Sequence, residues 1–572
     1  MKYDIMLFSL PNKNMDYPGL ALPTLTAHLR EKKYRTFQED SNVIIRDKMM
    51  TEGFLNDLTH TILPNIYYQN LNDTKISKRI KQIIDFYIKI EQIHGFDEIE
   101  KIKKDMQSRK YAELLSEEKS FEIVSILFKI SRSFHNIIDI IPNYSSLFED
   151  FSIYNPIEEY LKKILDNIKK SNPFAVGFTV LNIQRKFTIN FAERLSNDFS
   201  GYIFVGGPDP TKFGKQYIES YPFLDVAFIK ESEENLLQIM EIIKNDGDDF
   251  SNIPAIVYKN NNTIKENKIK PINFENLLTP DFDGISLDKY LTNVLPIQAS
   301  RGCFYGKCKF CIHWKTYFKY YQKKPENVAK DLEILSNKYN TKFFHFTDDA
   351  LEFELGNKIC QEITEKKLDV RWLTYARFES KFSKDSLELW KKAGVSVIEW
   401  GLESASDKVL NRMQKGINPR IAERIIKDSS EVGITNKLFL FHDYPDETSS
   451  DLSKTIDFID DNIRHGRIRF FMPIRNKFEL LKDSQLYEES LKDYRNLFKK
   501  IWFPSGIFAI RAEYFDLNDY TKKKEMLDIF LRNMTRYMEE KNIYTTDDEN
   551  ITLDIICNYL SEQKIPIPFN QN

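Results

Sequence analysis

The stretch RGCFYGKCKFC, residues 301–311, brings three cysteines into nine positions of a 572-residue chain that holds five cysteines in all. They are Cys303, Cys308 and Cys311, and they follow closely on the apolar run Leu295–Ala299. Thiols stay reduced inside cells, so a dense group of cysteines in a cysteine-poor chain indicates a metal or catalytic site rather than disulfides. We therefore expect the loop after this strand to carry the chemistry.

Two kinds of metal site suit three clustered thiols. A structural zinc ion needs four ligands, and the nearest candidate for the fourth is His313, whose C-x-H spacing from Cys311 makes an awkward chelate. A [4Fe-4S] cluster instead takes three thiolates and keeps one iron open for a small molecule. The remaining cysteines, Cys360 and Cys557, stand in helical patterns and are expected in the hydrophobic core.

Apolar strands alternate with helices over residues 295–475. One of these helices shows a clear start, because Asn418 caps it and Pro419 occupies its first turn. The alternation predicts an open (β/α)6 partial barrel, with its chemistry at the carboxyl ends of the strands. The expected strands are Leu295–Ala299, Phe343–Thr347, Val370–Thr374, Val397–Leu402, Lys437–Phe441 and Ile468–Met472.

Polar residues follow three of these strands where each strand ends. Asp348 and Asp349 follow the second strand, and Arg377 follows the third. Glu403 and Ser404 follow the fourth. Because parallel strands of a barrel end at a common mouth, these side chains should gather near the three thiols.

Residues 1–246 show another series of strands and helices, beginning with YDIMLFSL and LALPTLTAHLREKKY. The series predicts a doubly wound, Rossmann-like α/β domain, interrupted by a helical insertion over about residues 50–165. Ligands of such sheets bind beyond the carboxyl ends of the strands. The turn Gly206–Pro208 stands at one such end, where it either lets the backbone approach a ligand or is an ordinary tight turn.

Two further segments complete the expected organisation. Residues 247–294 are dense in Asn, Pro and Asp, which is typical of a linker. Residues 476–572 are aromatic at first and helical later, and they predict a mostly helical C-terminal domain that caps the barrel. This domain forms either a lid over the barrel mouth or a helical cap without substrate contact.

Composition excludes some classes of protein. Lys and Arg number 82 against 85 Asp and Glu, a net charge of -3, so the totals indicate no nucleic-acid partner. No apolar stretch reaches the roughly 20 residues that cross a bilayer. We therefore expect a cytoplasmic protein without a membrane span.

The loop SRGCFYGKCKFC resembles the cluster loop of the radical S-adenosylmethionine (SAM) superfamily. The commonest spacing there is C-x3-C-x2-C, whereas this chain has C-x4-C-x2-C, and Gly306 can absorb the additional residue. FHFTDDAL, VSVIEWGLESASDKVLNRMQKGI and GITNKLFLFHDYPDETSSDLSKTIDFI are similar to later strand-and-loop signatures of the superfamily. In the last of these, Asp443 and Tyr444 precede Pro445, where the superfamily often has a glycine.

The first domain is similar to the cobalamin-binding domain that precedes the radical SAM core in many such enzymes. YPGLALPTLTAHLREKKY, AVGFTVL, FVGGPDPT and DVAFIKESEENL occur in the expected order, so the resemblance spans about residues 1–475 apart from the insertion. No D-x-H-x-x-G motif is present, which implies that no histidine coordinates cobalt from below. The implied cobalamin surface comprises Leu20, Thr179, Gly206, Gly207, Pro208 and Thr211.

The resemblance also implies roles around SAM. The three cysteines would hold the [4Fe-4S] cluster, and the open iron would bind the amino and carboxylate groups of SAM. Phe310 would lie beside the adenine or pack in the core. The polar residues would contact the rest of SAM: Asp348 or Asp349 at the ammonium, Arg377 at the carboxylate, and Glu403 with Ser404 at the ribose.

The activity implied is that of a radical SAM enzyme. Its 5′-deoxyadenosyl radical would abstract hydrogen from an unactivated carbon, and cobalamin would deliver a methyl group to that carbon in a peptide or natural product. The same scaffold without methyl transfer would support cross-linking, epimerisation, cyclisation or rearrangement, and a zinc-stabilised binding protein is the non-catalytic alternative. A flavodoxin- or ferredoxin-type electron donor is the implied partner.

Overall fold

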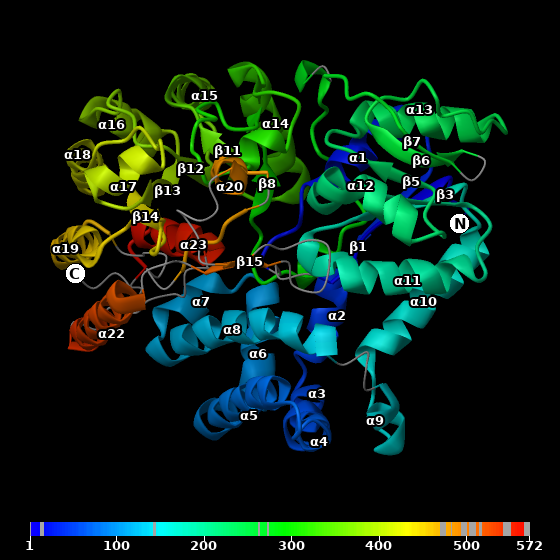
Figure 1. The fold of residues 1–572 in the computed structure, drawn as a ribbon, viewed down its shortest axis with the longest axis horizontal. Helices are drawn as coiled ribbons and strands as arrows, with labels where there is room; N and C mark the ends of the chain where they lie inside the picture. Colours follow the sequence, from blue (N-terminus) through cyan, green and yellow to red (C-terminus); the bar gives the residue numbers. More distant parts are fainter. Residues whose placement is uncertain are drawn as a thin grey trace. The chain divides into compact units, whose positions relative to one another are not determined.

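The structure is a computed structural model that describes residues 2–11, 16–140, 145–260, 263–271, 274–468, 476–481, 483–492, 500–502, 511–513, 517–540 and 551–565. It divides into two compact units, Met1–Pro296 and Ile297–Asn572. Each unit is built around its own β-sheet, as the strand labels in Figure 1 show.

The first unit contains a seven-stranded sheet in the order β2-β1-β3-β4-β5-β6-β7. Strands β1 to β5 are parallel, and β6 and β7 run antiparallel. All five residues of β1 are buried, as expected for an apolar strand covered by helices on both faces. The strands are β1 Ile5–Ser9, β2 Thr36–Asp40, β3 Ala175–Thr179, β4 Tyr202–Gly206, β5 Val226–Phe228, β6 Ile256–Asn260 and β7 Thr263–Glu266.

Helices connect the parallel strands of this sheet, and a group of helices between β2 and β3 forms the expected insertion. The connecting elements are α1 Ala21–Glu31, α2 Ser41–Met49, the 3-10 helix η3 Asn182–Gln184, α11 Arg185–Ser196, α12 Pro208–Ser220 and α13 Glu233–Lys244. The insertion comprises α3 Glu52–Asp57, the π-helical turn η1 Leu58–Ile62, α4 Leu63–Gln69, α5 Thr74–His94, α6 Phe96–Gln107, α7 Tyr111–Ser116, α8 Glu118–Ile140, α9 Ser145–Asp150 and α10 Pro156–Ser171.

The segment expected to be a linker, residues 247–294, contains regular structure. Strands β6 and β7 form a hairpin within it and extend the first sheet, which is therefore mixed rather than wholly parallel. Val257 and Tyr258 are buried in this hairpin. The apolar run of β6 is short and lies among Asn and Lys residues, so the composition of the segment predicted a linker rather than a strand. The segment also contains the 3-10 helices η4 Phe274–Asn276 and η5 Leu287–Lys289.

The second unit contains a five-stranded sheet in the order β14-β13-β12-β11-β8. Five of the six expected strands are found at the predicted places, and the sixth, Ile468–Met472, lies almost entirely outside the described residues. The strands are β8 Leu295–Ile297, β11 Phe343–Leu351, β12 Arg371–Ala376, β13 Val395–Glu403 and β14 Thr435–Leu440. The α/β fold class is thus confirmed: a Rossmann-like sheet, a second parallel sheet and a helical C-terminal region.

Helices pack around the second sheet, and Asn418 caps α18 by accepting a hydrogen bond from Arg420 N. Trp372, Trp390 and Trp400 are fully buried in this core. The helices are α14 Pro325–Tyr339, α15 Phe353–Glu365, α16 Lys384–Lys392, α17 Asp407–Arg412, α18 Pro419–Glu431, α19 Ser449–Arg464, α20 Gln485–Lys492, α22 Leu517–Glu540 and α23 Ile551–Glu562. The short elements are β9 Ser300–Arg301, β10 Tyr321–Gln322, η6 His313–Lys315, β15 Lys500–Trp502 and β16 Arg511–Glu513.

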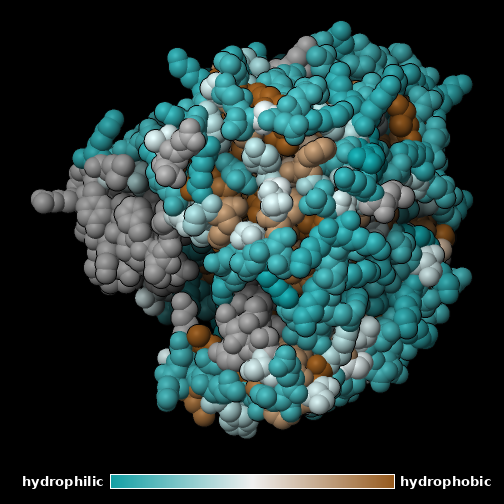
Figure 2. All heavy atoms as spheres, turned by 90° about the vertical axis from the view of Figure 1, so that its right-hand side faces the viewer, coloured by the Kyte–Doolittle hydropathy of each residue, from teal (hydrophilic) through white to brown (hydrophobic). Residues whose placement is uncertain are grey.

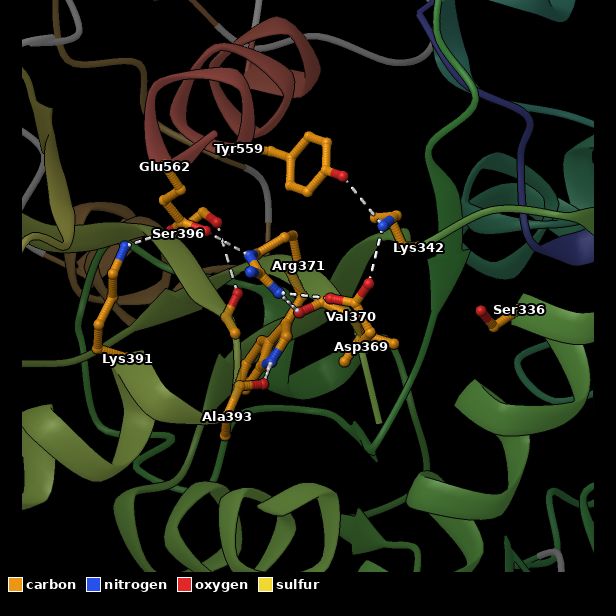
Figure 3. A network of polar contacts seen from close by, with 12 residues as sticks. Ser336, Lys342, Asp369, Val370, Arg371, Lys391, Ala393, Ser396, Tyr559 and Glu562 are labelled. Atoms are coloured by element: carbon orange, nitrogen blue, oxygen red, sulfur yellow. Dashed lines mark hydrogen bonds and ion pairs between the residues drawn. The ribbon is translucent and has the colours of Figure 1, made fainter. Parts of the chain in front are cut away.

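Helix α23 packs against β11, β12 and β13 near their amino ends (Figure 3). The cysteine loop instead follows the carboxyl end of β8. The carboxylate of Glu562 accepts hydrogen bonds from Arg371 Nε at 2.8 Å and from Lys391 Nζ at 2.9 Å. Lys342 donates to the Tyr559 hydroxyl at 3.1 Å. The end of the C-terminal region, α23, therefore packs at the barrel base. Most of the aromatic segment expected in a lid, residues 501–515, lies outside the described residues.

Figure 2 shows one face of the molecule, on which hydrophilic residues dominate and hydrophobic residues form small, separate areas. Among the helices that the structure describes, none is long and apolar enough to cross a membrane. Cys360 and Cys557 are fully buried, as expected for core residues.

Candidate active site at the carboxyl ends of the second sheet

The loop that carries the three cysteines begins after the carboxyl end of β8, and its end pairs with its beginning through the short strands β9 and β10. Strand β9 pairs antiparallel with β10, so residues 302–320 form an excursion closed at its base. Gly302 and Gly306 have φ of +78° and +60°, a left-handed conformation that glycine adopts without strain. Gly306 thus occupies a sharp bend in the longer spacing between Cys303 and Cys308.

The three thiols are half-buried and close enough together to influence one another electrostatically. Burial raises the pKa of Cys308, and Lys415 and Arg377 oppose this rise. Burial likewise raises the pKa of Cys311 to about 12. Cys308 and Cys311 therefore lie in a low-dielectric site in which burial disfavours the thiolate and nearby cations partly offset that effect.

The segment 413–416 supports the cysteine loop from behind. Its carbonyl groups accept hydrogen bonds from Lys309 N at 2.9 Å, from the Tyr305 hydroxyl at 2.8 Å and from Arg377 Nη2 at 2.8 Å. The guanidinium of Arg377 also lies 3.6 Å from the centre of the Tyr305 ring. This backing fixes the loop between the first two cysteines.

A buried ion pair adjoins the thiols. Lys415 Nζ donates to Glu403 Oε1 at 2.8 Å, and both side chains are 11% exposed. The ammonium of Lys415 also lies 5.7 Å from the centre of the Phe310 ring, between the second and third cysteines. Phe310 packs edge-to-face on Phe441 at 5.2 Å. Nothing in the sequence pattern distinguished Lys415 from other charged loop residues.

The two neighbouring aspartates of β11 differ in their contacts. Asp348 is fully buried, and its carboxylate accepts hydrogen bonds from the backbone and hydroxyl of Ser300 and from Ala299 N, so it fixes the start of the cysteine loop. Asp349 Oδ1 contacts His313 Nδ1 at 3.0 Å, while Asp349 Oδ2 is buried and has no hydrogen-bond partner among the described residues. Asp349 is the aspartate of the two that can accept a ligand.

Arg377, at the end of the neighbouring strand β12, carries a complementary unsatisfied donor. Its Nη1 is buried and, among the residues that the structure describes, has no hydrogen-bond acceptor. An unsatisfied buried charge is costly, so such groups commonly await a ligand. Asp349 and Arg377 together suit a zwitterionic group such as the amino-acid end of SAM.

Glu403 and Ser404 end the next strand, β13. Glu403 has φ +67°, a strained conformation for a residue with a side chain, of the kind that gathers at functional sites. Ser404 is fully buried, and its Oγ lies 3.2 Å from Thr455 Oγ1 and accepts from Ser406 N. The hydroxyl of Ser404 is thus engaged within the fold, whereas Glu403 lies beside the thiols.

A further charged group lies after β14, around Asp443, which precedes Tyr444 and Pro445 in the last of the quoted signatures. Asp443 Oδ1 lies 2.7 Å from Lys523 Nζ of α22, and Asp443 Oδ2 lies 3.3 Å from His442 Nδ1. Burial raises the pKa of Asp443, but contacts with His442 and Lys523 outweigh it and hold that pKa below its usual range. Burial also raises the pKa of Glu447 to about 7. These contacts attach α22 to the loop after β14.

The zinc alternative would need His313 as its fourth ligand. The Nδ1 of His313 lies 3.0 Å from Asp349 Oδ1. Within the described ranges, no group of three or more His, Cys, Asp and Glu side chains is arranged to hold one metal ion. A [4Fe-4S] cluster takes thiolates on separate irons, so the donor set of three thiols fits the cluster better than a single ion.

The first unit presents its expected site residues at the carboxyl edge of its own sheet. Thr179 and Gly206 are register partners at the ends of β3 and β4. Leu20 directly precedes α1, Pro208 begins α12, and Thr211 Oγ1 accepts a hydrogen bond from Lys230 N at 2.9 Å. The strand order 2-1-3-4-5 puts the topological switch point between β1 and β3, where such sheets bind ligands.

Gly207 at this edge lies in a left-handed turn packed against the end of β3. Its φ is +103°, and a Cβ there would lie 3.0 Å from Val180 O. After β3, the large hydrophobic side chains of Leu181 and Ile183 are 36% and 39% exposed. The edge thus has a tight backbone turn next to two exposed apolar side chains.

Residues 297–459 match the family model described as the Radical SAM superfamily. This segment contains the cysteine loop and the polar strand ends, and the match confirms the radical SAM prediction for this part of the chain, with a [4Fe-4S] cluster and SAM as its cofactors. Curated relatives are distant. An uncharacterized methyltransferase of Pyrococcus horikoshii is 26% identical over 302 residues, covering 51% of this chain and 65% of that protein.

Two other relatives carry different names. The 4′-phospho-dehydrooxetanocin synthase of Priestia megaterium is 24% identical, over 54% of this chain and 45% of that protein. The anaerobic magnesium-protoporphyrin IX monomethyl ester cyclase of Cereibacter sphaeroides is 24% identical, over 44% of this chain and 43% of that protein. The chain thus spans less than two thirds of the length of each relative named here.

Solved structures share the fold. Apo OxsB, a cobalamin-dependent SAM radical enzyme, matches with a TM-score of 0.61 at 15% identity, over 99% of this chain and 76% of that chain. The radical SAM methyltransferase TsrM of Kitasatospora setae, solved with cobalamin and a [4Fe-4S] cluster, matches with a TM-score of 0.55 at 13% identity, over 88% and 82%. At these identities the likeness shows the fold.

Proposed function

We propose that the protein, whose residues 297–459 match the Radical SAM superfamily, is a cobalamin-dependent radical SAM enzyme that methylates an unactivated carbon of a peptide or natural product. The observation that carries the proposal is the arrangement of Cys303, Cys308 and Cys311 beside the unsatisfied groups of Asp349 and Arg377. Three thiols and an adjoining zwitterion site are what a cluster with SAM on its open iron requires.

The cofactors supply the reactivity: cluster and SAM together yield a 5′-deoxyadenosyl radical, and cobalamin carries a methyl group. The protein's own residues bind and orient. Asp349 Oδ2 would accept a hydrogen bond from the SAM ammonium, and Arg377 Nη1 would donate one to the SAM carboxylate. Glu403 would reach the ribose once its contact with Lys415 opens.

Cobalamin binding rests on the first unit. Its sheet has the order 2-1-3-4-5, and its carboxyl edge combines the Gly207 turn with the exposed side chains of Leu181 and Ile183. A corrin ring is broad and largely apolar, so an exposed apolar edge beside a closely approaching backbone is an appropriate surface for it. The solved structures of the same fold include cobalamin complexes, which supports this proposal.

A radical outcome without methyl transfer is the second candidate. The relatives of this chain include a synthase and a cyclase as well as methyltransferases, so the shared scaffold does not select one reaction. The two candidates differ in the fate of the methyl group of SAM.

The decisive experiment uses protein purified without oxygen and supplied with cobalamin and methyl-labelled SAM. We expect absorption from both cluster and corrin, cleavage of SAM to 5′-deoxyadenosine, and labelled product from a substrate pool of peptides and small molecules. Replacement of Cys303, Cys308 or Cys311 by Ala should abolish iron loading and SAM cleavage, whereas the core variants Cys360→Ala and Cys557→Ala should keep both.

The cobalamin part has its own test. Leu181→Glu with Ile183→Glu puts charge on the exposed apolar edge and should remove corrin absorption while leaving the cluster intact. Ile269→Glu changes a side chain of the same exposure, 36%, elsewhere in the first unit and should have no effect. Cobalamin-free parent protein that cleaves SAM would support the second candidate, and a thiol variant that still cleaves SAM would contradict the cluster assignment.

A further inference from the structure

The cysteine loop lies in the middle of a strongly basic stretch of a chain that is acidic overall. Residues 301–325 contain seven Lys and Arg residues and no Asp or Glu, whereas the whole chain has a net charge of -3. Such a local excess creates a positive potential over the loop that the total charge conceals. The individual contacts decide which of these charges reach solvent.

Four of the seven basic residues are engaged within the fold. Lys309 pairs with Glu489 and Lys315 with Glu488, both on α20, at 2.9 and 3.1 Å. Arg301 is buried beneath the Tyr317 ring. Lys323 pairs with the buried Asp331 at 2.7 Å. These four residues anchor the excursion to α14 and α20 and add little to the surface potential.

Three basic residues of the stretch are exposed, namely Lys307, Lys319 and Lys324, and the following contacts concern the first two. Lys307 and Lys319 contact the rings of Tyr305 and Tyr321, and neither has a carboxylate within ion-pair distance in the described part of the chain. Lys307 directly precedes Cys308 in the sequence. Positive charge that the fold does not neutralise is thus presented beside the thiols.

Two large aromatic side chains are exposed on the same excursion. Trp314 is 39% exposed and Phe318 is 43% exposed. Trp314 Cβ lies 3.8 Å from the point where a Cβ on Gly306 would stand, so the indole lies against the loop between the first two cysteines. Exposed Trp among basic residues is typical of interface centres, because a flat ring loses little entropy when a partner covers it.

We propose that this face, formed by Lys307, Trp314, Phe318, Lys319 and Lys324, is the docking surface for an acidic electron-carrier protein of the flavin or iron–sulfur class. The proposal rests on the proposed function, because a radical SAM cluster must be reduced before SAM is cleaved. One electron passes from the reduced carrier to the oxidised cluster; the carrier is oxidised by one electron, the cluster is reduced by one, and no atom is transferred.

Charge complementarity selects this occupant. An acidic carrier is steered to the lysines at long range, and the aromatic side chains supply a small apolar contact, as suits a transient electron-transfer complex that buries less than about 1,200 Å². The half-buried thiols lie within the same loop, so the docked carrier is adjacent to the cluster.

The test measures reduction of the cluster by an acidic flavodoxin held in its hydroquinone form, at low and high salt, in parent holoenzyme and in Lys307→Glu with Lys319→Glu. At low salt we expect the cluster of the double variant to be reduced at least about tenfold more slowly than that of the parent. The reduction rate of the variant should also change less with salt concentration. The matched control, Lys358→Glu with Lys427→Glu, makes the same charge change on the exposed faces of α15 and α18 and should behave as the parent does.

Trp314→Ala should slow reduction at every salt concentration, because it removes apolar contact rather than charge. Dithionite, which needs no docking surface, should reduce the cluster fully in all variants. Equal amounts of paramagnetic reduced cluster would show that the variants bind as much cluster as the parent and are impaired only in docking the carrier. If the two Lys→Glu changes reduce the cluster content of the protein, the neutral double variant Lys307→Gln with Lys319→Gln is tested in their place.

Reduction of the reversed variant at the parent rate, or equal slowing in the control, would overturn the docking proposal. So would a variant that flavodoxin reduces normally but that fails in dithionite-driven turnover, since that outcome assigns the lysines to an anionic substrate. Failure of the proposed function has a different signature, a parent protein that holds no cluster under any reductant.

Discussion

Among individual residues, Gly207 has a backbone conformation that only glycine adopts without strain. Its φ of +103° is unfavourable for any side chain, and a Cβ would lie 3.0 Å from Val180 O and 3.1 Å from Val180 N. A bulky replacement therefore disturbs the turn itself, and a loss of cobalamin in such a variant would not identify a binding surface.

We expect Gly207→Ala to destabilise the first unit by about 1–3 kcal/mol, because strain of this kind costs that much per residue. Hydrogen exchange of peptides from β4 and α12 would show the loss as faster local opening. Gly206→Ala is the control, since its Cβ would meet Phe228 Cβ at an ordinary 3.5 Å. Equal exchange in the two variants would contradict the assignment of strain to Gly207.

Lys415 is the residue whose charge bears most directly on the thiols. It opposes the rise in pKa that burial causes at Cys308 and Cys311, and Glu403 holds it in place at 2.8 Å. A cation beside an iron–sulfur centre stabilises the form with the additional electron. We expect Lys415→Met to make cluster reduction about tenfold less favourable, which is about 59 mV for a one-electron couple.

The measurement for Lys415 is a redox titration followed by electron paramagnetic resonance. Lys415→Arg keeps the charge and should keep the midpoint potential near that of the parent. An unchanged potential in Lys415→Met, with full iron loading, would show that the ammonium acts on Glu403 alone.

At the scale of elements, β13, β14 and α23 meet in a buried group of charges at the barrel base. Lys437 Nζ lies 3.7 Å from Glu399 Oε1 and 3.3 Å from Asp554 Oδ2, and all three side chains are at most 8% exposed. Burial raises the pKa of Glu399 from 4.5 to about 7, with Lys437 opposing the rise. Lys437 thus links the carboxylate of Glu399 on β13 to Asp554 on α23.

A pH dependence of stability follows from the raised pKa of Glu399. The folded protein binds the Glu399 proton more tightly than the unfolded chain does, so this contribution to stability is complete below pH 4.5 and is lost as the pH rises through about 7. A tenfold difference in proton affinity between the folded and unfolded states corresponds to about 1.4 kcal/mol of stability. We expect Glu399→Gln to lose less stability than the parent between pH 5 and pH 8.

Urea unfolding followed by circular dichroism at a series of pH values would measure this difference. Glu388→Gln, at an exposed position of α16, is the control and should follow the parent. Parallel pH profiles for parent and Glu399→Gln would show that the buried group does not control the barrel base.

At the scale of the whole molecule, periodicity and strand-end chemistry predicted most of the architecture. Five strands of the second sheet, the helical insertion and the thiol loop follow from local patterns that each segment carries by itself. The sequence could bring Asp349, Arg377 and Glu403 together because strand ends of a parallel sheet share one edge. It could not distinguish Asp348 from Asp349, because the two are equivalent in sequence and differ only in their tertiary contacts.

The features that sequence reasoning missed depend on contacts between distant segments. Segment 413–416 accepts hydrogen bonds from the cysteine loop, although the two lie about 110 positions apart in the sequence. No local sequence pattern indicates this contact. In sequence α23 is an ordinary amphipathic helix. Its position is determined by hydrogen bonds from Lys342, Arg371 and Lys391, which lie near the amino ends of the strands (Figure 3). The β6–β7 hairpin is short and surrounded by polar residues, so composition favoured a linker.

The distribution of tryptophan has an optical consequence. All five tryptophans of the chain, Trp314, Trp372, Trp390, Trp400 and Trp502, belong to the second unit, and the first unit has none. Near-ultraviolet emission excited through indole therefore reports on the second unit alone, with three fully buried rings giving a blue-shifted band. Trp314 lies against the thiol loop, so the arrival of a strongly absorbing chromophore there should quench the red edge of that emission first.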